Sequence, residues 1–230
     1  MQIRKSEERG RLKIDWLDAR HTFSFGNYYD PKHIHFEHLR VINEDRISAG
    51  GGFDTHPHEN MEIFTFIMSG ELKHKDSMGN GAVIKAGDIQ YMAAGSGVYH
   101  SEFNSSPKET CHLLQIWVIP NKKNVEPRYE HARYSLEEKR GKFICFASND
   151  GHDGSFKINQ NVNISVCYLT AGDRCTHQLE GKSAWVQVAK GSVSFNEELL
   201  NQGDGASVKD CSELVFDNAE DAELILFDFK

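Results

Sequence analysis

Short apolar stretches separated by glycine-containing turns recur along most of the chain. The stretch Met61–Met68 is rich in β-branched and aromatic residues and predicts a strand buried on both faces. The stretch His112–Ile119 alternates between apolar and polar positions, which predicts a strand with one buried face. Between them, Asn80-Gly81 is a strong hairpin signal. Because no long helical period occurs, the pattern predicts an all-β protein built as antiparallel barrels or sandwiches.

This strand-and-turn pattern occurs twice. The first occurrence predicts an N-terminal domain over residues 1–130, in which Phe23-Ser24-Phe25 predicts one further short strand. Residues 121–140 are polar and charged and predict a linker. The pattern resumes in residues 141–230, which predict a C-terminal domain with strands at Val162–Leu169, Ala184–Ala189 and Val193–Phe195, among others.

Length and charge exclude several classes of protein. A chain of 230 residues is long enough for two small β-domains with real cores. No apolar run approaches the ~18 residues of a membrane span, and the charged N-terminus has no signal-peptide core, so we expect a cytoplasmic protein. The 34 acidic residues outnumber the 26 basic ones, which makes nucleic acid and anionic membranes poor partners. We expect a monomer.

The five cysteines do not suggest a disulfide framework or a cysteine zinc site. Their number is odd, and no two are spaced as Cys-x-x-Cys. We therefore interpret them as buried, unreactive thiols; they are Cys111, Cys145, Cys167, Cys175 and Cys211.

Two pairs of metal-ligand residues stand out. His56 and His58 are separated by one residue, as are His100 and Glu102. On a strand, residues i and i+2 point to the same face, so each pair offers two ligands on one side of its strand. Brought together in a barrel, the four side chains suit a divalent transition metal and leave one or two coordination positions open.

Other polar residues are weaker candidates. His33 and His35 show the same spacing, but they follow Pro31 in a connecting segment and have no matching second pair. Glu62 is a candidate for orienting a ligand or transferring a proton, with a solvent-facing salt bridge as the alternative. His177 is the only histidine near the corresponding position of the C-terminal domain, and a lone histidine is more often structural.

These residues also carry a family resemblance. Gly50, His56, His58 and Glu62 resemble the first cupin motif, and Gly97–Asn104 resembles the end of the second, although Gly95 replaces its usual proline and Gly70 comes one position late. More closely, the chain up to about Tyr129 resembles the pirin family of two-cupin proteins. The matching segments are Trp16-Leu17-Asp18, His21–Phe25, Leu39–Asn43, His56-Pro57-His58, Asp76–Asn80, His100-Ser101-Glu102 and Gln115-Ile116-Trp117.

The pirin resemblance implies a fold, a ligand set and an activity. It implies two cupin barrels (double-stranded β-helix, or jelly-roll) packed together, the N-terminal one binding metal and the C-terminal one without ligands. It implies His56, His58, His100 and Glu102 as ligands of one divalent metal, expected to be Fe(II), with Zn, Cu, Ni, Co and Mn as alternatives. It also implies quercetin 2,3-dioxygenase-type opening of a flavonol by O2, with Glu102 as the catalytic proton acceptor.

Two other functions remain open at this point. Pirin-like proteins are also linked to regulation, so an iron-containing protein that senses redox state and binds a protein partner is one alternative. A zinc-dependent isomerase or hydrolase is the other, because many cupins are not oxygenases.

Overall fold

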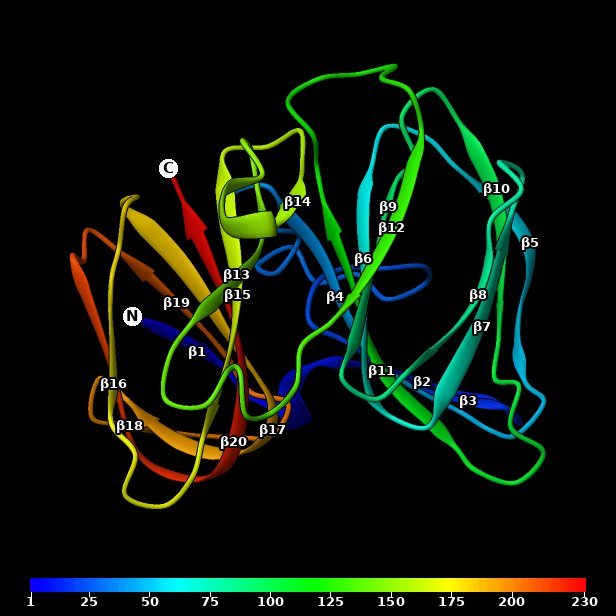
Figure 1. The fold of residues 1–230 in the computed structure, drawn as a ribbon. Coiled ribbons are helices and arrows are strands. Elements are labelled where there is room, and N and C mark those ends of the chain that lie inside the picture. Colours follow the sequence, from blue (N-terminus) through cyan, green and yellow to red (C-terminus); the bar gives the residue numbers. More distant parts are fainter. The chain divides into compact units, whose positions relative to one another are not determined.

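The computed structural model describes all residues, Met1–Lys230, and consists almost entirely of β-strands (Figure 1). The helical segments are two 3-10 turns, Ser6–Glu8 and His152–Gly154. Neither has the length or the apolar character that crossing a membrane requires. The chain forms two compact units, an N-terminal unit of residues 10–134 and a C-terminal unit of residues 135–230 together with residues 1–9. The all-β prediction is confirmed.

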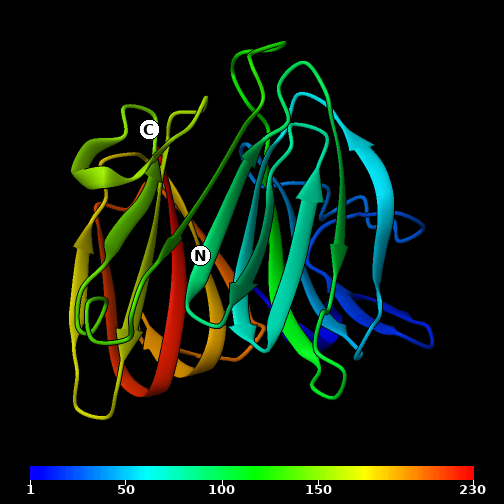
Figure 2. The same cartoon turned by 45° about the vertical axis from the view of Figure 1, so that its right-hand side comes forward.

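The N-terminal unit contains two antiparallel sheets, which face each other in Figure 1 and in the turned view of Figure 2. In spatial order the larger sheet consists of β12 (Arg128–Arg133), β9 (Asp88–Ala93), β6 (Glu62–Ser69), β11 (Cys111–Val118), β4 (Leu39–Ile47), β3 (Leu17–His21) and β2 (Gly10–Lys13). The smaller sheet consists of β5 (Gly52–His58), β10 (Val98–Phe103), β7 (Glu71–Asp76) and β8 (Gly81–Lys85).

The interior of this unit is layered. On β6, Thr65 lies between the inward positions of Ile63 and Ile67, and on β11, Gln115 lies between those of Leu113 and Trp117. One apolar cluster contains Leu17, Ile47, Ile67, Leu72 and Leu113, and a separate one contains Ile63, Met92 and Val98, with Trp117 packed against it. A polar layer therefore runs between two apolar layers.

The C-terminal unit is a single nine-stranded sheet that bends on itself. Its strands are β1 (Gln2–Arg4), β13 (Ile144–Ser148), β14 (Phe156–Lys157), β15 (Val162–Leu169), β16 (Cys175–Gln178), β17 (Ser183–Phe195), β18 (Glu198–Asn201), β19 (Gly205–Lys209) and β20 (Glu213–Phe229). The register of β17 against β20 shifts three times between Val188 and Ser194. Such irregularities bend a strand, so both long strands can pair with different neighbours along their length.

The interior of the C-terminal unit contains one large apolar cluster. It includes Val186, Phe195, Phe216 and Leu226, all fully buried. The rings of Phe195 and Phe216 stack with centroids 5.0 Å apart. No polar layer divides this cluster in the way that Thr65 and its neighbours divide the core of the N-terminal unit.

The domain boundaries differ from those expected for residues 1–130 and 121–140. Strand β1 pairs with β19, from Gln2 opposite Ser207 to Arg4 opposite Gly205, so residues 1–9 belong to the C-terminal unit. Strand β12 lies inside the expected linker, but it pairs with β9 and so extends the N-terminal unit. Both differences come from strand pairing between segments that are distant in sequence.

Two strand predictions are wrong. Phe23-Ser24-Phe25 forms no strand, because the Ser24 hydroxyl bonds to the backbone of Asp30 and His33 and holds a loop. The two strands expected at Ala184–Ala189 and Val193–Phe195 form one bent strand, β17, whose register shifts replace the expected turn. The Met61–Met68 prediction is confirmed, since residues 62–67 of β6 are fully buried.

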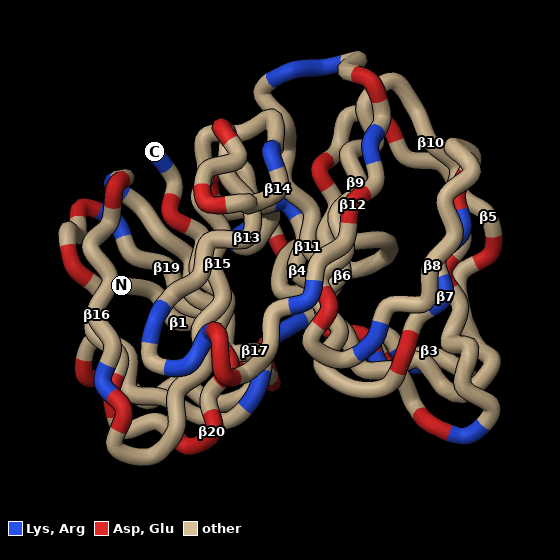
Figure 3. The backbone as a smooth tube through the Cα atoms, in the orientation of Figure 1, with Lys and Arg blue, Asp and Glu red and all other residues tan.

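All five cysteines are free thiols, and Cys111, Cys167 and Cys175 are buried, as expected. Cys145 and Cys211 are partly exposed, contrary to the expectation of burial. Acidic and basic positions are interspersed along both units in Figure 3. The excess of acidic residues is therefore spread over the chain.

Candidate metal centre

Strands β5 and β10 bring together the three histidines expected as ligands. The strands are antiparallel neighbours, and His100 lies directly opposite His56. The imidazole centroids of His56 and His58 are 4.9 Å apart, those of His56 and His100 are 4.4 Å apart, and those of His58 and His100 are 4.8 Å apart. One nitrogen from each ring lies within 4.8 Å of the others, close enough to share one metal ion.

Close approach of the two strands depends on Gly52. A Cβ atom there would lie 2.4 Å from the carbonyl oxygen of Glu102. Any larger residue would force β5 away from β10 and separate His56 from His100.

The orientation of the rings leaves lone pairs for a metal. The Nδ1 atom of His56 lies 2.7 Å from the carbonyl oxygen of Asp54, so it donates its hydrogen there and the lone pair is on Nε2. The Nε2 atom of His100 is buried and has no hydrogen-bond partner. A buried polar atom without a partner is costly, and coordination of a metal would remove that cost. The donor set therefore fits a divalent transition metal.

Glu102 lies at the same centre but is displaced along the strand. The register between β10 and β5 shifts after His100, so Glu102 lies opposite Phe53. One carboxylate oxygen of Glu102 is within 4.8 Å of ligand-type nitrogens of His100 and His74, in a group that includes neither His56 nor His58. Glu102 and the three-histidine group therefore share His100, and the set of four ligands stays a prediction.

Two neighbours hold the carboxylate of Glu102. The Gln115 side-chain amide donates a hydrogen bond of 3.0 Å to Oε2, and the Thr65 hydroxyl lies 3.4 Å from Oε1. Both neighbours belong to the polar layer of the interior. They fix the carboxylate without supplying a positive charge.

Burial sets the protonation of the centre. Burial, with repulsion from His56 added, lowers the pKa of His58 to about 4. Burial and the neighbouring histidines lower the pKa of His100 to about 2. Burial raises the pKa of Glu102 to about 7, against the hydrogen bonds from Gln115 and Thr65. The imidazoles of His58 and His100 are consequently held neutral, the form that binds metal.

A cavity of about 580 Å³ opens beside the centre and is lined by His56, His58 and Glu102. This volume is in the range of pockets that bind small organic molecules. All of its lining residues belong to the N-terminal unit. The remaining aromatic lining residues are Phe25, Tyr28, Phe53 and Trp117, and the remaining polar ones are Arg11, His21, Asn27, Asn43, Asp45 and Gln115.

Glu62 is not at the centre. Its side chain is 1% exposed and accepts a hydrogen bond from the Tyr91 hydroxyl, which in turn accepts one of 3.2 Å from Arg128. This buried position contradicts the solvent-facing salt bridge considered for Glu62, whereas a role in orienting a ligand or transferring a proton stays a prediction. Glu62 helps attach β12 to the sheet.

The rival histidines have local partners. The Nδ1 atom of His33 lies 2.8 Å from an oxygen of Asp30, and that of His35 lies 2.8 Å from the carbonyl oxygen of Glu37. They do not belong to either group of side chains close enough to share a metal ion.

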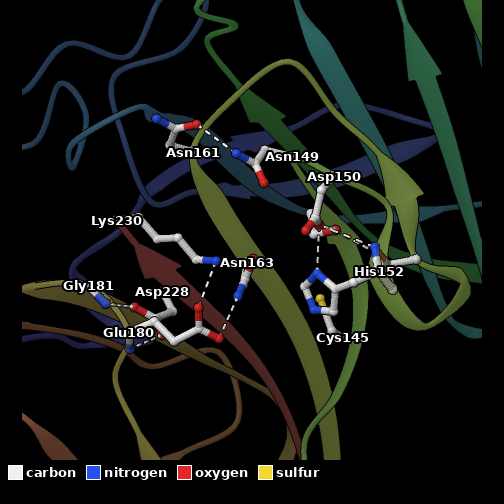
Figure 4. Close-up of polar contacts among 12 residues, drawn as sticks. Cys145, Asn149, Asp150, His152, Asn161, Asn163, Glu180, Gly181, Asp228 and Lys230 are labelled. Carbon is white, nitrogen blue, oxygen red and sulfur yellow. Dashed lines mark hydrogen bonds and ion pairs between the residues drawn. The ribbon is translucent and has the colours of Figure 1, made fainter.

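In the C-terminal unit, His177 lies 3.5 Å from the carboxylate of Asp228. That carboxylate also accepts hydrogen bonds from the backbone of Glu180 and Gly181, and Lys230 pairs with Glu180 at 2.7 Å (Figure 4). The two groups of side chains close enough to share a metal ion, His56/His58/His100 and His74/His100/Glu102, both lie in the N-terminal unit. His177 therefore takes part in a structural contact near the C-terminus.

Two residues of the centre were missed in the sequence. His74 and Asp76 on β7 are buried, and the Nδ1 atoms of His74 and His100 are 3.5 Å apart. Burial lowers the pKa of His74, although Asp76 opposes the effect. The signal in the sequence was the alternation of inward Leu72, His74 and Asp76 with two outward lysines.

Two family models match most of the chain. The model of a family described as pirin matches residues 2–118, and a model described as the quercetinase C-terminal cupin domain matches residues 145–229. The expectation of two cupin domains is thereby confirmed.

The chain is similar along nearly its whole length to several bacterial proteins. It is 42% identical over 227 residues to a protein of Escherichia coli K12 named quercetin 2,3-dioxygenase, covering 98% of this chain and 97% of that protein. It is 38% identical over 215 residues to a pirin-like protein of Caulobacter vibrioides, covering 93% and 92%. The crystal structure of the bacterial pirin YhhW from Escherichia coli in complex with nickel(II) superposes with a TM-score of 0.94 at 41% identity, covering 99% and 98%.

Proposed function

The chain belongs to the pirin family, and on that premise we propose that it is a metal-dependent dioxygenase that opens flavonols such as quercetin. His56, His58, His100 and Glu102 would hold the metal. Fe(II) is the metal we expect, and nickel, zinc, copper, cobalt and manganese suit the same donors. A related pirin forms a complex with nickel(II).

One observation carries the proposal. Three imidazoles converge beside a cavity of about 580 Å³, and the buried Nε2 of His100 has no other partner. A closed structural metal site would surround its ion with protein ligands, whereas this one has room for a small molecule at its side.

The chain's residues would bind and orient the substrate. Phe25, Phe53 and Trp117 line the cavity with aromatic surface suited to a planar ring system. Glu102 would accept the proton of the flavonol 3-hydroxyl at a carboxylate oxygen, while Gln115 and Thr65 hold the carboxylate in place. A bound metal would supply Lewis acidity toward the substrate oxygen and redox chemistry with O2.

The test is aerobic turnover of quercetin by protein reconstituted separately with Fe(II) and Ni(II), followed by O2 uptake and by detection of carbon monoxide. We expect turnover by the wild type and its loss in His56→Ala. The matched control is His33→Ala, which removes a histidine of the same unit that lies outside the cavity lining. The proposal would be refuted if neither the Fe(II) nor the Ni(II) protein turned over quercetin, or if His56→Ala and the wild type had equal rates.

A further inference from the structure

Behind the metal centre lies a pair of buried residues that the proposed ligand set does not use. His74 is 0% exposed and Asp76 is 7% exposed, and both point inward from β7. The ring of His74 stacks on that of Tyr129, with centroids 4.7 Å apart and planes 21° apart. Stacking and burial together fix the plane of the His74 imidazole.

The hydrogen positions follow from Asp76. Its Oδ1 accepts hydrogen bonds from the backbone of Met78 and Asn80 at 2.9 and 3.0 Å, and its Oδ2 accepts one of 2.9 Å from the Asn80 amide. Oδ2 also lies 3.1 Å from Nε2 of His74. An ionised carboxylate can only accept, so Nε2 of His74 must carry the hydrogen.

The next hydrogen bond is then determined. A neutral His74 with its hydrogen on Nε2 has a lone pair on Nδ1, which lies 3.5 Å from Nδ1 of His100. Two ring nitrogens can form a hydrogen bond only if one of them carries a hydrogen. That hydrogen must be on Nδ1 of His100, which leaves the lone pair of His100 on Nε2.

We propose that Asp76 and His74 are positioning residues that hold His100 in the tautomer and orientation whose Nε2 lone pair faces His56 and His58. This is the nitrogen that is buried without a hydrogen-bond partner. Hydrogen bonds from a carboxylate through an imidazole also increase the basicity of a metal ligand. The inference rests on the proposed metal centre and not on the identity of the substrate.

Asp76→Asn tests the direction of this chain of hydrogen bonds. An amide keeps an oxygen for the backbone of Met78 and Asn80 but presents an N–H to His74. His74 would then accept at Nε2 and donate from Nδ1, so the hydrogen of His100 would move to Nε2, where it blocks the metal. We expect the affinity for nickel(II) to fall about 10–100-fold, the usual cost of disturbing a residue behind a metal ligand.

Asp88→Asn is the matched control. Asp88 is in the same unit, and its carboxylate accepts a backbone hydrogen bond of 2.8 Å from Lys85 in the β8–β9 turn. The same chemical change there should leave the nickel affinity, measured by calorimetry, near that of the wild type. Equal losses in the two variants would overturn the proposal.

His74→Asn provides the conservative replacement. Its side-chain oxygen can take the place of Nδ1 and accept from His100, so nickel binding should be largely retained. In this background, Asp76→Asn should have little further effect, because the imidazole that transmits the change is gone. Additive losses would overturn the proposal, and complete loss of nickel binding in His74→Asn would make His74 a ligand instead.

The tautomer can be observed without any metal. In the metal-free protein with ¹⁵N-labelled histidine, NMR should show hydrogen on Nδ1 of His100 in the wild type and on Nε2 in Asp76→Asn. Hydrogen on Nε2 in the wild type would overturn the inference. If the wild type bound no nickel, the proposed metal centre would fail, and the spectrum would still decide the hydrogen-bond chain by itself.

Discussion

The two units build similar β-architectures around opposite interiors. In the N-terminal unit, Thr65, Gln115, His74 and Glu102 place hydrogen-bonding groups at mid-height, and the apolar residues form separate clusters on either side. In the C-terminal unit, one large apolar cluster occupies the interior, and buried polar residues such as Lys139 and Gln187 are not part of it. Buried polar groups are tolerated only when they are hydrogen-bonded, so the first interior is the costlier one to build.

This difference coincides with the location of the candidate functional residues, which lie in the N-terminal unit. A continuous apolar core is the stabler solution, and the C-terminal unit uses it. The N-terminal unit instead contains a polar layer beside the candidate metal centre, and under the proposed function this layer would hold residues that position the ligands. The predictions below change each interior in turn.

The largest expected effect separates the histidines of the two units. His58→Ala removes one of three converging imidazoles and should lower nickel(II) affinity by more than the about 10–100-fold typical of residues behind the ligands. His177→Ala should leave it unchanged, because His177 contacts Asp228 and not a metal-ligand group. Calorimetric titration measures the nickel(II) affinity of both variants. Comparable losses of affinity would contradict the assignment of the metal centre to the N-terminal unit.

Truncating the continuous core should be the largest effect on stability. Phe216→Ala removes a fully buried ring that packs on Phe195 and Phe143, and should lower the free energy of unfolding by about 3–5 kcal/mol. Urea unfolding followed by circular dichroism measures the loss. Nickel affinity of the folded variant should stay unchanged, and a fall would mean that the apolar cluster supports the metal centre.

A reciprocal exchange sharpens the comparison further. Thr65→Val removes the hydroxyl that contacts Glu102 and Gln115, and Val186→Thr puts a hydroxyl into the apolar cluster. Each should lower the free energy of unfolding by about 1–3 kcal/mol, because each leaves a buried polar group poorly paired. Nickel affinity should fall in Thr65→Val alone. If Thr65→Val were stabilising, the polar layer would not be a hydrogen-bonded unit.

The smallest expected effect concerns the cavity wall. The ring of Trp117 lies edge-on to that of His58, with centroids 4.9 Å apart. Trp117→Leu should weaken quercetin binding by about 0.5–1.5 kcal/mol, the usual worth of an aromatic contact. Calorimetry on the nickel-loaded protein measures it, and Leu199→Ala, a change at an exposed residue of the C-terminal unit, is the control. Equal binding by both variants would exclude Trp117 from the substrate site.

The histidine cluster could be predicted from the sequence because it depends on the spacing of residues within single strands. Two residues apart on a strand means one face, so the spacing alone pairs His56 with His58 and His100 with Glu102. The register shift after His100, which moves Glu102 away from His56 and His58, depends on how β10 and β5 pair. Pairing between strands that are distant in sequence leaves no periodic trace in either one.

His74 and Asp76 were missed for a different reason. Lys73 and Lys75 alternate with them along β7, so the segment looks like an ordinary half-exposed strand, in which a histidine and an aspartate are unremarkable. Only the approach of His100 from a neighbouring strand reveals what they do. The strands that were predicted well, such as β6 and β15, contain long apolar runs. Such a run identifies a strand even when its neighbouring strand in the sheet is unknown.

The pairing of β1 with β19 builds the C-terminal unit from two segments that are far apart in the sequence. During synthesis the residues of β1 are made before those of β19, so they can pair only after Gly205–Ser207 have been synthesised. Residues 10–134, whose unit is continuous in sequence, can fold in the meantime. A fragment that begins at Ser135 would leave β19 as an open edge with unpaired backbone groups, which invites aggregation.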